Sequence, residues 1–311
     1  MQMFDKIAIV GVGLIGSSLG RALMYKKLAG EVVGLVRRPD MINISMKAKC
    51  LHRATLDAKD AISDADAIII ATPLSQYENV MAATLPYMKK NAIVSDVGSA
   101  KTTAIATIEK AMQKHHRPDI NIIPAHPIAG TELSGAENGM AHLFQDMFCI
   151  ITPPEKYDQM AYDKIVALWS GIGAKVEKMT IAHHDDVLAI TSHIPHLIAY
   201  SITGTARNFE NQPDSREVIK YSAGGWRDFT RIAASDPVMW RDIFLANKHA
   251  MLYQLQSFQK DLQTLCQAID NDDGAALENW FAKTREIRKA LPSVSQLSDD
   301  KKQRDNFYDR Q

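Results

Sequence analysis

The first half of the chain alternates short apolar runs with segments whose apolar residues recur at helical spacing. The apolar runs lie at residues 6–10, 31–36, 66–71, 92–97, 120–125, 148–152 and 175–179. Strands buried on both faces of a sheet are continuously apolar, and strands that alternate with helices are typical of a mostly parallel sheet. The pattern therefore predicts an α/β fold, with a doubly wound sheet covered by helices on both faces.

The pattern changes near residue 180, where strand signals stop and helical spacing takes over. Residues 180–208 predict one helical region, which Pro195 interrupts. Ser235-Asp236-Pro237 predicts the start of a long helix, because it supplies a capping side chain and a proline in the first turn. The predicted parts are an α/β domain at residues 1–180, an all-helical domain at 181–291 and a mobile polar tail at 292–311.

A long apolar stripe runs along the predicted helix that starts near Pro237. Its residues recur at three- and four-residue spacing: Leu245, Leu252, Leu255, Phe258, Leu262 and Leu265. A stripe of this length has to be buried. It predicts either an intramolecular core or a homodimer interface in the helical domain.

The composition excludes several classes of protein. The 311 residues hold 36 basic and 36 acidic side chains, so no charge excess favours a nucleic-acid partner. The three cysteines are far apart and form no CxxC pair, so no disulfide framework or thiolate zinc site is indicated. We see no signal peptide and no apolar run approaching the roughly 18 residues of a membrane span. A cytoplasmic protein without a membrane partner is expected.

A glycine-rich loop joins the first predicted strand to the first helix. In this GxGxxG pattern Gly11 permits a tight turn, Gly13 lets a pyrophosphate approach the backbone, and Gly16 lets the helix pack closely. The helix begins at Leu14. The N–H groups of its first residues, Leu14 and Ile15, and its positive dipole end are offered to the phosphates. We predict a Rossmann-like domain in which these five residues bind a dinucleotide.

The end of the second predicted strand bears on the choice of dinucleotide. NAD sites usually place a carboxylate there, to accept hydrogen bonds from the adenosine ribose. Here the position is Val36, and Arg37 and Arg38 follow. Guanidinium groups bind phosphate well, so the sequence predicts that NADP is preferred and that NAD is possible. Alternatively, both arginines are solvated surface charges.

Three further strand ends are expected beside the glycine loop, because the carboxyl ends of parallel strands meet at one edge of a sheet. They carry Thr72-Pro73, Ser99 and His126. His126 is predicted to lie on a loop after its strand, where it could exchange a proton near neutral pH. A structural hydrogen bond is the alternative for His126, and capping of the next helix is the alternative for Ser99.

The histidines of the helical half raise the question of a metal site. His193 and His196 are three residues apart, and two carboxylates precede them. Pro195 disturbs the helix between them, however, and no HExxH or comparable set occurs. We therefore predict no metal site.

The chain resembles the prephenate/arogenate dehydrogenases of tyrosine biosynthesis, a family that includes cyclohexadienyl dehydrogenases. The motifs that carry the resemblance are the glycine loop, DVGSAK at 96–101, HPIAGTE at 126–132, SHIPH at 192–196, GGW at 224–226, DFTRI at 228–232 and SDPVMW at 235–240. They occur in the family's order. The glycine loop is common to many dehydrogenases, whereas the combination of the other motifs is much more specific.

The resemblance implies a reaction and a set of site residues. Prephenate or arogenate would give a hydride to the nicotinamide and lose its ring carboxylate as carbon dioxide. His126 would bind the ring hydroxyl, Ser99 would hold this histidine in its working tautomer, and Arg231 would bind a substrate carboxylate. The remaining residues matched to the substrate pocket are His196, Thr131, Ser192 and His193.

The resemblance leaves the choice between prephenate and arogenate open, including acceptance of both. Glu132 and Asp228 are the carboxylates that could bind the ammonium group of arogenate. The resemblance includes neither a chorismate mutase segment before the first strand nor a regulatory ACT domain after the last helix. Feedback by tyrosine, if it occurs, is therefore expected at the active site.

Two other functions fit parts of the pattern. β-Hydroxyacid dehydrogenases and imine reductases also join a Rossmann domain to a helical dimer domain, but they usually rely on a lysine or aspartate of the helical domain. A non-catalytic NADP-sensing regulator would need no pairing of His126 with Ser99. Tight cofactor binding without turnover would favour this second alternative.

Overall fold

The computed structural model describes residues 2–131, 133–210 and 220–290. The predicted tail at 292–311 and Glu132 lie outside these residues. The chain divides into two compact units, Met1–Met251 and Leu252–Gln311. Each unit is described here by itself.

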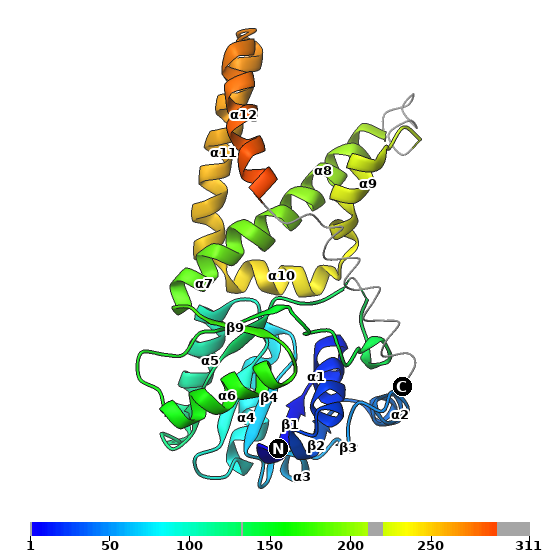
Figure 1. Ribbon diagram of the computed structural model, residues 1–311, viewed down its shortest axis with the longest axis vertical. Coiled ribbons are helices and arrows are strands. Elements are labelled where there is room, and N and C mark those ends of the chain that lie inside the picture. Colours follow the sequence, from blue (N-terminus) through cyan, green and yellow to red (C-terminus); the bar gives the residue numbers. More distant parts are fainter. Residues whose placement is uncertain (1, 132, 211–219, 291–311) are drawn as a thin grey trace. The chain divides into compact units, whose positions relative to one another are not determined.

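The first unit is built on a six-stranded parallel sheet with the order β3-β2-β1-β4-β5-β6 (Figure 1). Its strands are β1 (Phe4–Val10), β2 (Ala29–Leu35), β3 (Arg53–Thr55), β4 (Ala67–Ile70), β5 (Ile93–Asp96) and β6 (Asn121–Ile122). This order places β1 and β4 at the centre, where the chain reverses the direction in which strands are added. The predicted Rossmann-like fold is therefore confirmed.

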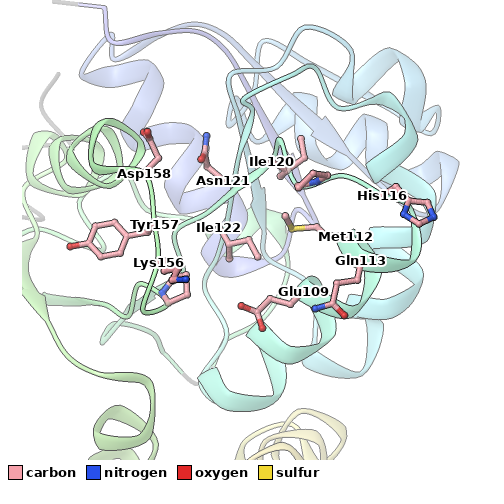
Figure 2. Close-up of a pocket in the computed structure, with 12 residues that line it drawn as sticks. Glu109, Met112, Gln113, His116, Ile120, Asn121, Ile122, Lys156, Tyr157 and Asp158 are labelled. Carbon is pink, nitrogen blue, oxygen red and sulfur yellow. The ribbon is translucent and has the colours of Figure 1, made fainter.

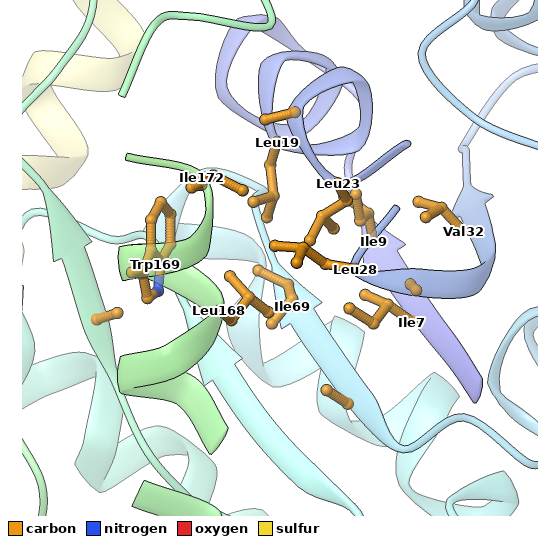
Figure 3. Close-up of a cluster of buried hydrophobic side chains, with 14 of the residues drawn as sticks. Ile7, Ile9, Leu19, Leu23, Leu28, Val32, Ile69, Leu168, Trp169 and Ile172 are labelled. Atoms are coloured by element: carbon orange, nitrogen blue, oxygen red, sulfur yellow. The ribbon is translucent and has the colours of Figure 1, made fainter. Parts of the chain in front are cut away.

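Two hydrophobic cores lie on opposite faces of this sheet, because side chains of a strand alternate between faces. On β1, Ile7 and Ile9 enter one core and Ala8 and Val10 enter the other. The first core is covered by α1 (Leu14–Tyr25) and α6 (Gln159–Gly171), and Figure 3 shows Leu19, Leu23 and Trp169 meeting there. The second is covered by α3 (Ala58–Ile62), α4 (Tyr77–Thr84) and α5 (Lys101–Lys114).

Three elements between residues 37 and 65 were not predicted from the sequence, namely α2 (Pro39–Lys47), β3 and α3. In α2 only Ser45 is fully buried, and the apolar Met41, Ile42 and Ile44 are half-buried against the core. The strand β3 holds Arg53, Ala54 and Thr55, all half-buried, at the edge of the sheet. Hydrophobic periodicity detects buried elements, and these elements lie at the margin of the core.

The predicted single strand at residues 120–125 is wrong, because the chain changes sheets at Pro124. The β6 residues pair with β5, whereas β7 (Ala125–Pro127) pairs antiparallel with β8 (Phe148–Ile151). Proline has no N–H to give to a ladder. A second sheet of order β7-β8-β9 results, with β9 (Lys175–Lys178) parallel to β8. His126 accordingly lies within a strand and not on a loop after one.

The helical part of the first unit begins with α7 (Ile181–Leu188), a π-helical segment (Ala189–His193) and α8 (Ile194–Glu210). The π-helical segment ends where Ile194 N–H donates to Ala189 O. Pro195 follows directly and cannot donate a backbone hydrogen bond. The predicted interruption at Pro195 thus takes the form of a wider turn, not of a break. The unit continues with α9 (Gly224–Thr230), a 3₁₀ turn (Arg231–Ala234) and α10 (Pro237–Ala246).

The predicted long helix after Pro237 is two helices, α10 and α11 (Lys248–Asp270), separated at Asn247. The second unit consists of the rest of α11 and of α12 (Gly274–Ala290), which is capped by the Asp273 carboxylate. Of the stripe residues, Leu245, Leu252 and Leu262 are 67%, 47% and 48% exposed, whereas Leu255, Phe258 and Leu265 are half-buried. Both alternatives from the sequence, an intramolecular core and an interface between chains, therefore stay predictions.

Candidate active site

The glycine loop between β1 and α1 has the geometry of a phosphate cradle. Gly11 has φ +93°, and a Cβ there would lie 2.8 Å from Ala71 O, so only glycine fits. A Cβ on Gly16 would overlap Gly11 O, whereas a Cβ on Gly13 would meet no heavy atom within 4 Å. Gly13 therefore faces open space at the start of α1.

The groups around this open space suit a dinucleotide. No side chain caps α1, so the N–H groups of its first turn, at half-buried Leu14 and Ile15, are available to phosphate oxygens. After β4, Thr72 Oγ1 is buried and has no hydrogen-bond partner among the residues that the structure describes, next to the exposed Pro73. A buried hydroxyl without a partner is rare in a native structure unless a ligand or water completes it. The residues present fit the cofactor predicted from the sequence.

The two arginines after β2 are both exposed. Arg38 is the N-terminal cap residue of α2, and its Nε and Nη2 donate to Asp40 Oδ1 and Oδ2 at 3.1 and 3.0 Å. The Arg38 and Asp40 side chains are 57% and 55% exposed. Exposed pairs contribute little, about 0–1 kcal/mol, so Arg38 can exchange this partner for a phosphate at small cost.

His126 lies on β7 with 8% of its surface exposed, and its ring is held by a second histidine. His126 Nδ1 is 2.9 Å from His184 Nε2, and the rings meet edge to face. His184 is fully buried on α7, and its Nδ1 is 2.9 Å from Asp185 Oδ1. A continuous chain of hydrogen bonds therefore runs from His126 through His184 to Asp185.

Asp185 also caps α5, which follows β5. Its Oδ1 accepts from Lys101 N–H and its Oδ2 from Thr102 N–H, each at 2.8 Å. The capping role that was considered for Ser99 is therefore wrong: the N-terminal cap position is Ala100, and the first N–H groups of α5 bind a carboxylate from α7. The ring nitrogen of His126 that a positioning serine could hold is likewise bonded to His184.

A buried ion pair fixes the backbone beside His126. Lys101 Nζ donates to both oxygens of Asp96 at 2.8 Å and to Ala125 O at 2.6 Å. Asp96 Oδ2 also accepts from Tyr77 Oη and from Gly98 N–H. Removing one partner of such a pair typically costs about 3–5 kcal/mol. Lys101 thus holds β7 against β5 at the residue before His126, although the two strands belong to different sheets.

The surroundings of His126 keep its ring neutral. Burial lowers the pKa of His126 well below its ordinary value of 6.5, and the neighbouring His184, Lys101 and His193 lower it further. Burial also lowers the pKa of His184, although Asp185 opposes that shift. A proton on either ring would sit without water beside the Lys101 ammonium group. At neutral pH His126 is therefore a hydrogen-bond acceptor through one of its nitrogens.

Apart from Thr131, which lies on the loop after β7, the other predicted substrate residues lie on the helical part of the unit. The His196 ring stacks on Trp240, with ring centroids 3.6 Å apart, and its Nδ1 donates to Ser192 O at 2.8 Å. Burial lowers the pKa of His196 and the Arg231 charge lowers it further, although the hydrogen bond to Ser192 O opposes this shift. Thr131 is half-buried, and its Oγ1 accepts from Leu133 N–H.

His193 is fully buried on the π-helical segment. Asn247 Nδ2 lies 2.8 Å from Asp185 O and 3.1 Å from His193 Nδ1, so it ties α7 to the π-helical segment. His193 Nε2 is buried without a hydrogen-bond partner among the described residues. Burial lowers the pKa of His193 to about 4. The predicted contact of His193 with the substrate stays a prediction.

Several residues of this arrangement were not singled out from the sequence, namely His184, Asp185, Lys101, Asp96, Trp240 and Asn247. Two of them, Asp96 and Lys101, are the first and last residues of the DVGSAK motif. The motif was therefore a signal in the sequence that could have pointed to these two residues. Asp185 is one of the two carboxylates that were weighed for a metal site. Its contacts with Lys101 and Thr102 of α5 join positions 84 and 83 residues apart, which no local pattern reveals.

A separate pocket of about 880 Å³ opens elsewhere on the first unit (Figure 2). Its lining residues come from the end of α5, from β6 and from the segment before α6, and they include Glu109, His116 and Tyr157. None of the predicted site residues lines it, so it does not belong to the candidate active site.

Within residues 2–131, 133–210 and 220–290, no three His, Cys, Asp or Glu side chains are grouped so that they could hold a metal ion. Within the same described residues, no helix is both long and apolar enough to cross a bilayer.

The fold, the glycine cradle and the enclosed histidine define a nicotinamide-dependent oxidoreductase. Residues 19–178 match the prephenate dehydrogenase nucleotide-binding domain, and residues 180–283 match the prephenate dehydrogenase dimerization domain. A cyclohexadienyl dehydrogenase of Zymomonas mobilis is 39% identical over 293 residues, which cover 94% of this chain and 97% of that protein. The chain belongs to the prephenate dehydrogenase family.

Two further relatives agree with this assignment. A prephenate dehydrogenase of Bacillus subtilis is 29% identical over 94% of this chain and 77% of that protein. The crystal structure of prephenate dehydrogenase from Aquifex aeolicus, in complex with hydroxyphenyl propionate and NAD+, has a TM-score of 0.85 and 29% identity. The superposition covers 94% of this chain and 99% of that one.

Proposed function

We propose that the chain catalyses the oxidative decarboxylation of prephenate, of arogenate or of both. The products are 4-hydroxyphenylpyruvate and tyrosine, respectively, so the reaction belongs to tyrosine biosynthesis. The family assignment supports this class of reaction. The relatives' names include both prephenate and cyclohexadienyl dehydrogenases, and they leave the choice of substrate open.

The observation that carries the proposal is the enclosed His126, held through Nδ1 and neutral near pH 7. Its other nitrogen, Nε2, makes no hydrogen bond to the described residues and is not among the fully enclosed polar atoms without partners. It can accept a hydrogen bond from the ring hydroxyl of the substrate. That bond raises the electron density on the hydroxyl oxygen. It thereby helps the hydride to leave the ring carbon that carries this hydroxyl.

The overall reaction balances without uptake or release of a proton. A bound nicotinamide would supply the hydride acceptor. As the hydride leaves, the bond between the ring and its carboxylate breaks, carbon dioxide departs, and the electron pair of that bond completes the aromatic ring. His126 stabilises the hydroxyl-bearing carbon during this change. His126 itself does not have to gain or lose a proton. Such a group typically contributes about 10²–10⁴-fold to the rate.

Two carboxylates of the substrate need binding partners. We assign one of them to the exposed Arg231, whose charge reaches His196, with His196, Ser192 and Thr131 as further polar contacts. Guanidinium groups suit this role because they bind carboxylates in a bidentate way. Ser99, on the loop between β5 and α5, remains assigned to the cofactor. The His126 ring that the resemblance assigned it to hold is bonded through Nδ1 to His184. The possible role of Glu132 towards the ammonium group of arogenate falls outside the described residues.

For the cofactor we propose NADP in preference to NAD, held by the glycine loop, by Thr72-Pro73 and by Arg37 and Arg38. The exposed positions of both arginines after β2 support this preference. Asp40 qualifies it, because this carboxylate lies next to Arg38 and could instead accept hydrogen bonds from the ribose of NAD.

We also propose that the protein works as a homodimer through its helical half. The match of residues 180–283 to a dimerization domain and the exposed residues of the apolar stripe support this assembly. Leu262→Asp should shift the protein towards monomers in sedimentation velocity, whereas Met160→Asp, at an exposed residue of α6, should not. Equal sedimentation of Leu262→Asp and the unmodified protein would contradict an interface at the stripe.

The function is tested by a four-way assay of the purified protein, with prephenate or arogenate as substrate and NAD or NADP as cofactor. Formation of reduced nicotinamide with either substrate is the expected result, and the strongest combination identifies substrate and cofactor together. Adding tyrosine to that combination tests competitive inhibition at the active site. Folded protein that binds a dinucleotide and turns over neither substrate would contradict the proposal and favour a hydroxyacid dehydrogenase or a sensor.

The division at residue 180 remains a proposal about function. Residues 1–180 would bind the cofactor, and residues 181–291 would bind substrate and the second subunit. A cytoplasmic location and the absence of a nucleic-acid partner also remain predictions from the sequence.

A further inference from the structure

Asp185 accepts several hydrogen bonds at once and has no role as a donor. Its two oxygens receive the N–H groups of Lys101 and Thr102 at the start of α5, where the helix dipole also favours a negative charge. Burial opposes ionisation of Asp185, but the bonds from His184 and from this backbone lower its pKa below the ordinary value. The carboxylate is therefore ionised at neutral pH and can only accept.

This acceptor determines where the protons lie on both histidines. Because Asp185 Oδ1 can only accept, the proton of the neutral His184 ring must be on Nδ1, 2.9 Å away. His184 Nε2 is then a lone-pair acceptor, and the nitrogen 2.9 Å from it, His126 Nδ1, must carry the proton. We propose that His184 and Asp185 are positioning residues that fix His126 as the Nδ1–H tautomer and thereby reserve Nε2 as the acceptor for the substrate hydroxyl.

The competing arrangement needs a charged His184. With protons on both of its nitrogens, His184 would donate to His126 Nδ1, and His126 Nε2 would become a donor. That charge would sit fully buried and close to the Lys101 ammonium group, which lowers the pKa of His184. Lys101 is already matched by Asp96 at 2.8 Å. The neutral arrangement is the one that these buried charges favour.

The proposal deepens the proposed function and rests on it for its kinetic consequence. A donor at Nε2 would compete with the hydroxyl proton and withdraw electrons from the oxygen, so the reversed tautomer cannot assist the hydride. Asp185→Asn should produce this reversal. With its amide nitrogen in the place of Oδ1, the asparagine would donate to His184 Nδ1 and lose the hydrogen bond from Lys101 N–H. His184 would then donate to His126 Nδ1, and His126 would carry its proton on Nε2.

The chain offers matched controls for this experiment. His183 and Asp186 are exposed residues of the same types on either side of the buried pair. We expect Asp185→Asn to lower kcat by about 10²–10⁴-fold, with the KM and the dinucleotide affinity of the folded protein changed little, because the altered tautomer acts on the reacting hydroxyl and not on ligand binding. Asp186→Asn and His183→Gln should keep kcat within about twofold. The kcat of His184→Gln should lie between that of Asp185→Asn and those of the two controls. The glutamine amide oxygen can still accept from His126 Nδ1, but the same side chain no longer also reaches Asp185.

A second measurement does not depend on turnover. In histidine-selective ¹⁵N NMR of the unmodified protein, with His126→Asn used to assign the signal, His126 should show a protonated Nδ1 and an unprotonated Nε2. This pattern should reverse in Asp185→Asn. The measurement also covers the case in which Asp185→Asn fails to fold through loss of its cap on α5.

Three results would overturn the proposal: a protonated Nε2 on His126 in the unmodified protein, an unchanged kcat in folded Asp185→Asn, or an equal loss in Asp186→Asn. Absence of turnover with both substrates in the unmodified protein would instead contradict the proposed function. In that case the NMR signal still decides the tautomer.

Discussion

The groups around His126 are buried and joined by hydrogen bonds, whereas the arginines assigned to the anionic parts of the ligands are exposed. His126 is 8% exposed and His184 is fully buried, while the Arg38 side chain is 57% exposed. Buried polar networks hold one geometry because any unpaired member costs free energy. Exposed guanidinium groups can change partners. The difference suggests that the enclosed region determines the chemistry and the exposed region selects the ligand.

The strongest test of this comparison removes the imidazole itself. In His126→Asn the shorter amide can still donate to His184 Nε2, but nothing replaces His126 Nε2. We expect kcat to fall by about 10²–10⁴-fold while dinucleotide affinity, measured by fluorescence titration, stays within about twofold. His183→Asn is the control, because it removes an exposed histidine of α7. Turnover equal to that of the unmodified protein would remove His126 from catalysis.

The exposed region should respond in a different kinetic parameter. Arg231→Ala removes a charged hydrogen bond to a substrate carboxylate, which is worth about 1.5–3 kcal/mol. The KM should therefore rise by about 10–100-fold, with a smaller change in kcat. Arg227→Ala, one helical turn earlier and also exposed, should leave the KM unchanged. If Arg231→Ala lowers only the folded fraction in thermal melts, Arg231 is structural and the comparison fails at this point.

The other exposed arginines sharpen the comparison for the cofactor. Arg37→Ala and Arg38→Ala should each weaken NADP binding by about tenfold and leave NAD binding nearly unchanged, because only NADP carries the extra phosphate. Lys47→Ala, an exposed residue in the last turn of α2, serves as the control. NADP affinity that is unchanged in both arginine variants would contradict the proposed preference.

The smallest expected effect concerns pH. The folded protein holds His126, His184 and His193 neutral, with pKa values below 6.5 and about 4 for His193. The unfolded chain takes up protons near pH 6.5 that the folded chain does not. The free energy of unfolding should therefore fall as the pH falls, by roughly 0.7 kcal/mol between pH 7 and 6 for His193, with a decrease in the same direction for His126 and His184.

Activity should behave differently over the same interval. Because His126 stays neutral, kcat should be constant from pH 7 down through 6.5 while the urea midpoint already declines. An acid limb of kcat near pH 6.5 would contradict the enclosed, neutral state of His126.

The same contrast explains what the sequence could predict. Strands such as β1 and β4 have continuous apolar runs, and the glycine loop has a fixed spacing, so both were predicted correctly. At residues 120–125 the apolar run gave no sign that Pro124 divides it between two sheets. The apolar stripe of α11 was correctly identified, but its pattern could not say whether the partner belongs to the same chain.

The histidine network shows a further limit. His126 was identified by its motif, but its partner His184 is 58 residues away in sequence. The cap that Asp185 forms on α5 is equally remote, and the nearby Ser99 was the local choice. Contacts of this kind depend on how α7 packs against α5, which one sequence does not reveal.

The cap on α5 has a consequence for how such a chain can be recombined. A chimera that joins residues 1–180 of one relative to the remainder of another would exchange the helix N-terminus on one side and the carboxylate on the other. A hybrid can keep both apolar cores and all its glycines and still lose the proton arrangement of its histidine if these two surfaces do not meet. Halves of this enzyme are therefore interchangeable only as a pair matched at Asp185 and the start of α5.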